Sequence, residues 1–171
     1  AGRLCFMEVC GGHTMAIHKF GIPSLLPEVI RLKSGPGCPV CVTAKTFIDR
    51  AIAYACMPDV MVCTYGDLLR VPGSRGTLLD QRGEGSDIRM VYSLLEALRL
   101  AREHPNRRVV FLGIGFETTA PATAVGVLQA DRERLGNFFV LSSHKLMPPA
   151  MNAIAGDGVA IDGYLCPGHV S

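Results

Sequence analysis

Short apolar runs alternate with amphipathic stretches along most of the chain. Many of the runs are rich in Val, Ile and Phe and apolar on both faces, which is typical of strands in a covered parallel sheet. We predict strands at 3–9, 29–33, 60–65, 87–92, 108–114, 138–143 and 162–166.

Apolar residues at helical spacing lie between several of these runs. They predict helices at 44–56, 93–103, 119–133 and 148–155, and Thr43 is the expected N-cap of the first. Strands that alternate with helices indicate an α/β fold with mostly parallel sheets.

A segment rich in Gly, Pro and Arg, residues 66–86, interrupts this alternation. We interpret it as a connector between two small three-layer α/β/α lobes. The expected division is a first lobe at 1–66, a connector at 67–86 and a second lobe at 87–171.

The composition favours a folded cytoplasmic protein. Apolar residues make up 49% of the chain, and the net charge, 17 − 15 = +2, is too small to indicate a nucleic-acid or membrane partner. No run approaches the roughly 20 apolar residues of a transmembrane helix, and no secretion signal is visible. The chain opens directly on a strand and stops within a Gly-His motif, so we expect a piece of a longer protein.

The unusual motifs all follow predicted strands. In open α/β sheets, ligands bind beyond the carboxyl ends of the strands, so we expect these loops to line a cleft between the lobes. The motifs occupy residues 10–14, 35–43, 113–119, 142–144 and 166–169.

An odd number of cysteines, seven, in a chain without an export signal argues against a disulfide framework. Three lie inside apolar runs, where a thiol packs well in a core: Cys5, Cys56 and Cys63. Four lie beside Gly or Pro in loops and are candidates for chemistry: Cys10, Cys38, Cys41 and Cys166.

Cys10 is followed by Gly11, Gly12, His13 and Thr14. The two glycines leave the sulfur unshielded, so a ligand or partner chain can approach the backbone. A thiolate here can act as a nucleophile or bind a soft metal ion, with His13 as a hydrogen-bond donor or base. The alternative is a tight strand-to-helix turn in which the cysteine is incidental.

Cys38 and Cys41 form a Cys-x-x-Cys pair ahead of a predicted helix. A helix N-terminus stabilises thiolate, which favours redox or labile metal chemistry. Half of a structural zinc site and simple packing remain as alternatives.

Polar residues also follow the fifth strand. Gly113 and Gly115 resemble the start of a dinucleotide fingerprint, but the third glycine is missing, so phosphate binding is weakly supported. Helix capping and polar contacts in the cleft are both open for Glu117, Thr118 and Thr119.

Two further histidines, His144 and His169, follow the sixth and seventh strands. Each is as compatible with a hydrogen-bonded structural role as with a place in the site.

Several motifs together resemble one family. MEVCGGHTMAIHKFG, SGPGCPVCVT, CTYGDLLRVPG, GFETTAP and PGHVS occur in this order in HypD proteins, the scaffolds of nickel-iron hydrogenase maturation. The resemblance covers essentially all 171 residues.

The resemblance implies that the chain works with a small partner, HypC, to assemble an iron that carries two cyanides and one carbon monoxide. Cys10 matches the cysteine implicated in holding this iron, with a HypC cysteine as the other ligand. HypE delivers cyanide as a protein thiocyanate, and Cys38 and Cys41 match a redox-active pair. Family members also carry a four-iron iron-sulfur cluster in a C-terminal domain, which we expect to be absent from this chain.

The residues themselves are compatible with this chemistry. Thiolates suit a ferrous iron that binds cyanide and carbon monoxide, and a dithiol supplies the two electrons that release cyanide from a thiocyanate. We therefore expect an assembly scaffold with redox chemistry rather than a simple turnover enzyme. A thiol-disulfide oxidoreductase and a zinc-stabilised interaction module are the alternatives.

Overall fold

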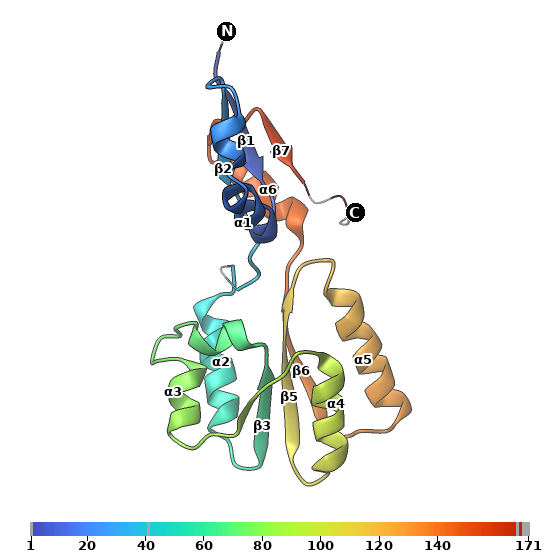
Figure 1. The fold of residues 1–171 in the computed structure, drawn as a ribbon. Helices are drawn as coiled ribbons and strands as arrows, with labels where there is room; N and C mark the ends of the chain where they lie inside the picture. Colours follow the sequence, from blue (N-terminus) through green and yellow to red (C-terminus); the bar gives the residue numbers. More distant parts are fainter. Residues whose placement is uncertain (1, 41, 167, 169–171) are drawn as a thin grey trace. The chain divides into compact units, whose positions relative to one another are not determined.

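Parallel strands connected by helices make up the part of the chain that the computed structural model describes, residues 2–40, 42–166 and 168 (Figure 1). The strands are β1 (Leu4–Glu8), β2 (Ile30–Ser34), β3 (Val60–Thr64), β4 (Ile88–Met90), β5 (Arg108–Gly115), β6 (Phe138–His144) and β7 (Gly163–Leu165). The α-helices are α1 (Gly11–Lys19), α2 (Lys45–Ala55), α3 (Leu78–Gly83), α4 (Leu94–Glu103), α5 (Ala120–Arg132) and α6 (Met147–Gly156). Two 3-10 helices are η1 (Ile22–Leu25) and η2 (Gly66–Arg70).

The strands form two parallel sheets, which confirms the predicted α/β class. One sheet has the order β2-β1-β7 and the other β4-β3-β5-β6. The first unit comprises Ala1–Cys38 and Leu146–Ser171, and the second comprises Pro39–Lys145. No helix in the described ranges is long and apolar enough to cross a bilayer.

This division differs from the predicted one at 67–86. Strand β3 pairs with both β4 and β5, so the segment before β4 joins two strands of one sheet. The first sheet instead pairs β1 with β7, from the far end of the chain. A pairing between segments so distant in sequence leaves no local signal, and composition placed the boundary incorrectly for that reason.

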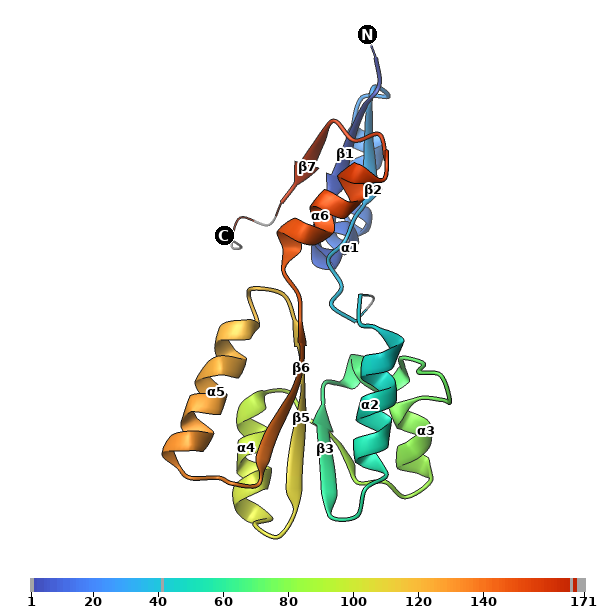
Figure 2. The ribbon, with the colours of Figure 1, turned by 180° about the vertical axis from the view of Figure 1, so that it is seen from behind.

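The first unit has one helix on each face of its sheet. Figures 1 and 2 show α1 on one side and α6 on the other. Tyr164 donates a hydrogen bond to the Met151 carbonyl of α6 at 3.2 Å, and Tyr164 is the register partner of Met7. Because side chains alternate along a strand, Phe6 and Glu8 lie on the opposite face, which α1 covers.

The second unit contains the main hydrophobic core. Strand β3 is buried at every position, because Val60 and Val62 pack on the α2 side while Met61 and Cys63 pack on the α4 side. This two-sided burial explains why the strand is apolar throughout. Complete burial of one large aliphatic side chain, such as Ile48 of α2, contributes about 1.5–3 kcal/mol.

The start of α2 differs from the prediction. Its N-cap is Ala44, and no side chain caps it. Thr43 instead donates its hydroxyl hydrogen to the Pro39 carbonyl at 2.8 Å, within the preceding turn. Thr43 as the N-cap was therefore wrong.

Residues 66–86 are structured and packed against the rest of the second unit. Helix η2 buries Leu68 and Leu69, and α3 begins with a reciprocal capping box between Thr77 and Asp80. The hydrogen bonds from Thr77 lower the pKa of the Asp80 carboxyl group.

Candidate functional site

Three of the motifs begin at one edge of the first sheet. Strands β1, β2 and β7 are parallel and adjacent, so their carboxyl ends share an edge. Hydrogen bonds extend the pairing past the strand ends, from Val9 N–H to the Leu165 carbonyl at 3.0 Å and from Gly35 N–H to the Glu8 carbonyl at 2.9 Å. The segments that carry Cys10, Cys38 and Cys166 therefore all leave from this edge.

Cys10 lies between the end of β1 and the start of α1. It is the N-cap residue, with extended backbone (φ 165°, ψ 127°), and its carbonyl accepts hydrogen bonds from the Thr14 N–H at 3.2 Å and the Thr14 hydroxyl at 3.4 Å. Its thiol is free and half-buried. These two hydrogen bonds from Thr14 therefore fix the backbone of Cys10, which carries the sulfur.

The two glycines after Cys10 leave the first turn of α1 open. A methyl group at Gly11 would meet no atom within 4 Å, and one at Gly12 would lie 3.6 Å from the Cys10 Sγ. The sulfur therefore lies over the first turn of the helix. His13, also in this turn, is half-buried.

Gly35 and Gly37 pack directly against the Cys10 segment. A Cβ atom at Gly37 would overlap the Cys10 Cα and lie 2.7 Å from the Gly11 nitrogen, and one at Gly35 would lie 2.7 Å from the Glu8 carbonyl oxygen. Only glycine fits such an approach. Sequence reasoning missed this role, although the Gly-Pro-Gly stretch before Cys38 was its signal.

An open groove of about 600 Å³ runs beside α1, lined by Gly11, Thr14 and Met15 on one side and by Gly35 and Cys38 on the other. Cys38 is half-buried with a free thiol. The structure thus brings Cys38 and the first turn of α1 to one groove. Cys41 lies outside the described residues, so its pairing with Cys38 stays a prediction.

The remaining described cysteines have different environments. Cys63 is completely buried, and desolvation raises the pKa of its thiol to about 12, so it is a core residue as expected. Cys56 is exposed and donates to the Gln81 Oε1 at 3.1 Å, so its predicted place in the core was wrong. Cys5 is half-buried and Cys166 is exposed.

A buried carboxyl group, that of Glu8, lies two residues before Cys10 and was missed at the sequence level. Only 1% of this residue is exposed. The sequence feature that could have identified it is an acidic residue inside an otherwise apolar strand. Among the described residues, no group of three or more His, Cys, Asp and Glu side chains is placed to hold a metal ion.

The second unit carries the polar residues that follow β5. Thr119 is the N-cap residue of α5, and its hydroxyl donates to the Phe116 carbonyl at 3.1 Å. Gly115 has φ +148°, and a side chain there would overlap Thr119. Glu117 is half-buried and Thr118 is exposed.

His144, at the end of β6, joins this cluster. Its Nδ1 lies 2.9 Å from the Ser142 hydroxyl and its Nε2 lies 3.4 Å from the Thr123 hydroxyl of α5. Desolvation lowers the pKa of the imidazole, which favours the neutral ring. His144 therefore links β6 to α5, while His169 lies outside the described residues.

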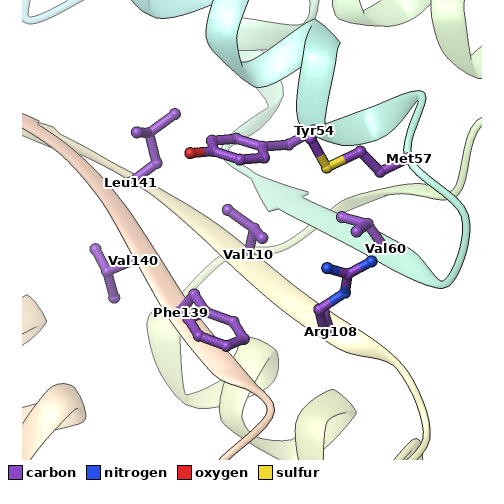
Figure 3. Close-up of a pocket in the computed structure, with 8 residues that line it drawn as sticks. All are labelled: Tyr54, Met57, Val60, Arg108, Val110, Phe139, Val140 and Leu141. Carbon is purple, nitrogen blue, oxygen red and sulfur yellow. The ribbon is translucent and has the colours of Figure 1, made fainter.

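The second unit also has a pocket of about 280 Å³ that contains none of the predicted site residues. Figure 3 shows Tyr54 of α2 and Val110, Phe139 and Leu141 of the sheet around it, with Arg108 at one side. The pocket lies on the α2 side of β5 and β6. It is thus separate from the carboxyl end of β6, where His144 lies.

The chain matches the family model described as "HypD: Hydrogenase formation hypA family" over residues 1–171. It is 53% identical to the hydrogenase maturation factor HypD of Azotobacter vinelandii over 172 residues, covering 96% of this chain and 45% of that protein. It is 48% identical to the HypD of Escherichia coli K12 over 169 residues, covering 98% and 45%.

The HypD of Rhodobacter capsulatus is 49% identical over 166 residues, covering 96% of this chain and 44% of that protein. The chain thus spans less than half the length of these relatives. The full-length family match and these identities confirm the resemblance drawn from the motifs: the chain belongs to the HypD family of hydrogenase maturation factors.

Proposed function

We propose that this chain is the part of a hydrogenase maturation scaffold that holds iron while its two cyanide ligands and one carbon monoxide ligand are assembled. Cys10 is the iron-binding residue, and a HypC-type partner supplies a second thiolate. The observation that carries this proposal is the free thiol of Cys10 over the open first turn of α1.

The donor chemistry supports Cys10 as an iron ligand. The iron group is the cargo of the scaffold, and a low-spin ferrous iron with cyanide and carbon monoxide ligands suits soft thiolate donors. The absence of side chains at Gly11 and Gly12 leaves room for a partner chain beside the sulfur. His13, in the same turn, is the proposed proton donor or acceptor at the site.

Cys38 and Cys41 are proposed to supply the electrons that release cyanide. A protein thiocyanate delivered by a HypE-type donor accepts two electrons, its sulfur–carbon bond breaks, and a thiolate and a cyanide ion form. The two cysteine thiols lose two electrons and two protons as they form a disulfide. The place of Cys38 in the groove beside α1 supports this assignment.

The cluster in the second unit is proposed as a set of polar contacts for a ligand of that unit. Thr118, Thr119 and His144 are its members, and Glu117 is the proposed acid or base. In the full-length family, an iron-sulfur cluster would restore the dithiol after each cyanide transfer.

The test is anaerobic reconstitution of the chain with ferrous iron, a HypC-type partner and a cyanide donor, followed by iron quantitation and infrared spectroscopy. The wild-type chain is expected to retain iron with cyanide stretches. Cys10→Ala should lose the iron and keep its circular dichroism spectrum, because Cys10 lies outside the described hydrophobic core clusters. Cys56→Ala, which changes an exposed cysteine of the second unit, is the matched control.

Three outcomes would contradict the proposal. Iron retention by Cys10→Ala at the wild-type level would remove Cys10 from the site. Disulfide reduction in the absence of metal, or one tightly held zinc ion per chain, would favour the oxidoreductase or the zinc module instead.

A further inference from the structure

Glu8 has a carboxyl group that is buried without a hydrogen-bond partner. Only 1% of the residue is exposed, and among the described residues neither carboxyl oxygen has a partner. A buried polar group without a partner destabilises a folded protein, and for that reason most such groups in proteins are satisfied. An unpartnered buried carboxyl group beside a candidate site therefore calls for a functional explanation.

The side chain of Glu8 points to the same side of the sheet as the Cys10 sulfur. Glu8 lies on the face that α1 covers, opposite to Met7 and its register partner Tyr164. Cys10 follows in extended backbone, and its Sγ lies over Gly12 in the first turn of α1. The Cα atoms of alternate residues in an extended chain lie roughly 6.6 Å apart, so Glu8 and Cys10 extend their side chains from neighbouring positions on one face.

The neighbours of Glu8 do not provide its missing donors. Its register partners are Ser34 in β2 and Leu165 in β7. Leu165 has no side-chain donor, and Ser34 makes no hydrogen bond to either carboxyl oxygen. The next turn begins with Gly11 and Gly12, which have no side chains. Both carboxyl oxygens are covered in the free chain, so a donor reaches them only when the segment at Cys10, Gly11 and Gly12 shifts as a partner binds.

We propose that Glu8 accepts a hydrogen bond from an N–H donor group that a partner polypeptide brings to Cys10. This inference rests on the proposed function and adds a recognition residue to the same site. Glu8 acts as a positioning residue, since it fixes the partner chain beside the sulfur and does not itself bind the iron. In the free chain the carboxyl group of Glu8 lacks a hydrogen bond, which destabilises the fold but leaves an acceptor for the partner.

The chemistry of the cargo points to the partner as the source of the donor. Iron, cyanide and carbon monoxide carry no N–H or O–H group, so the cargo alone leaves the carboxyl oxygens unsatisfied. A polypeptide offers backbone amides, ammonium groups and guanidinium groups, which are good donors to a carboxyl oxygen. The expected hydrogen-bond donor is therefore an N–H group of a protein partner.

The experiment compares Glu8→Leu, Glu8→Gln and the wild-type chain in two measurements, the melting temperature of the free chain and the affinity for a HypC-type partner by titration calorimetry. Glu8→Leu replaces the unsatisfied group with an apolar side chain. It is expected to raise the melting temperature by about 2–4 °C and to weaken partner binding by about tenfold. Glu8→Gln keeps one acceptor oxygen and should bind with intermediate affinity.

Glu28→Leu is the matched control, because Glu28 is exposed in the same unit, and it should change neither value. A lower melting temperature in Glu8→Leu would overturn the inference, since it would mean that the carboxyl group is already satisfied in the free chain. Unchanged partner affinity in Glu8→Leu would overturn it and leave the proposed function intact. Failure of the wild-type chain to bind the partner would overturn both.

Discussion

The Cys10 segment shows at the scale of single residues how backbone packing, more than side-chain chemistry, positions a candidate ligand. Gly37 lies against Cys10 so closely that any side chain would overlap its backbone, whereas Gly11 faces open space and a methyl group at Gly12 would make only an ordinary contact with the Cys10 sulfur. The sequence identified the cysteine and its two following glycines as chemically important. It did not distinguish a glycine needed for close packing from one that leaves a surface open.

Gly37→Ala should destabilise the chain by about 1–3 kcal/mol, because the added methyl group forces the Cys10 segment to move. Urea denaturation followed by circular dichroism measures the change. Gly11→Ala is the control, since a methyl group there meets no atom within 4 Å, and its free energy of unfolding should stay the same or rise. Equal stability of Gly37→Ala and the wild type would contradict the close packing.

Cys38 and Cys41 should form a reversible disulfide under mild oxidation, because two residues separate them and Cys38 carries a free thiol in an open groove. Mass spectrometry after alkylation checks this pairing. The exposed Cys56 should react with the alkylating reagent throughout. Cys63, whose buried thiol has a pKa of about 12, should react only after unfolding. Free alkylation of both Cys38 and Cys41 after oxidation would remove their redox role.

At the scale of elements, the strands and most helices follow from the hydrophobic pattern. The predicted helix at 93–103 corresponds to α4 at Leu94–Glu103, and the predicted strand at 108–114 to β5 at Arg108–Gly115. Helix α4 has a strong helical periodicity of apolar residues, and strand β5 is buried on both faces. Helix α3 was missed because it is short and starts with a polar capping box.

The link between β6 and α5 through His144 predicts a pH dependence. Burial lowers the pKa of this imidazole below its ordinary value of 6.5, so the folded chain binds the proton less readily than the unfolded chain does. The contribution to stability is full above pH 6.5 and is lost as the pH falls through the lowered pKa. The free energy of unfolding of the wild type should therefore fall, relative to that of His144→Gln, as the pH decreases below 6.5.

Urea denaturation at a series of pH values measures this difference. Both chains should show a constant difference in stability above about pH 7, where the imidazole is neutral in the folded and unfolded states. Parallel curves for the two chains down to pH 5 would show that His144 does not titrate differently on folding.

At the scale of the whole molecule, the chain leaves the first unit, forms the second and returns. The second unit contains β3 to β6 and both hydrophobic core clusters. The first unit consists of two segments that the second separates in sequence. This arrangement could not be read from the sequence, because nothing local to β1 or β7 indicates that these two strands pair.

Residues 39–145 should therefore fold without the rest of the chain, because the core of the second unit is made entirely within this segment. Thermal denaturation followed by circular dichroism should show one cooperative transition. Residues 1–38 alone should show none, since chains below about 40 residues rarely bury enough surface to fold. A non-cooperative melt of 39–145 would contradict this independence.

The pairing of β1 with β7 also sets an order of events during translation. A ribosome adds about 5–20 residues each second, so Cys10 emerges well before Leu165, whose carbonyl holds the Val9 N–H beside it. Until that partner strand arrives, one edge of β1 is unpaired and the backbone next to the thiol is not fixed. A nascent chain that stops early would expose Cys10 without the paired strand beside it, so under the proposed function we expect cargo to be loaded only after β7 is complete.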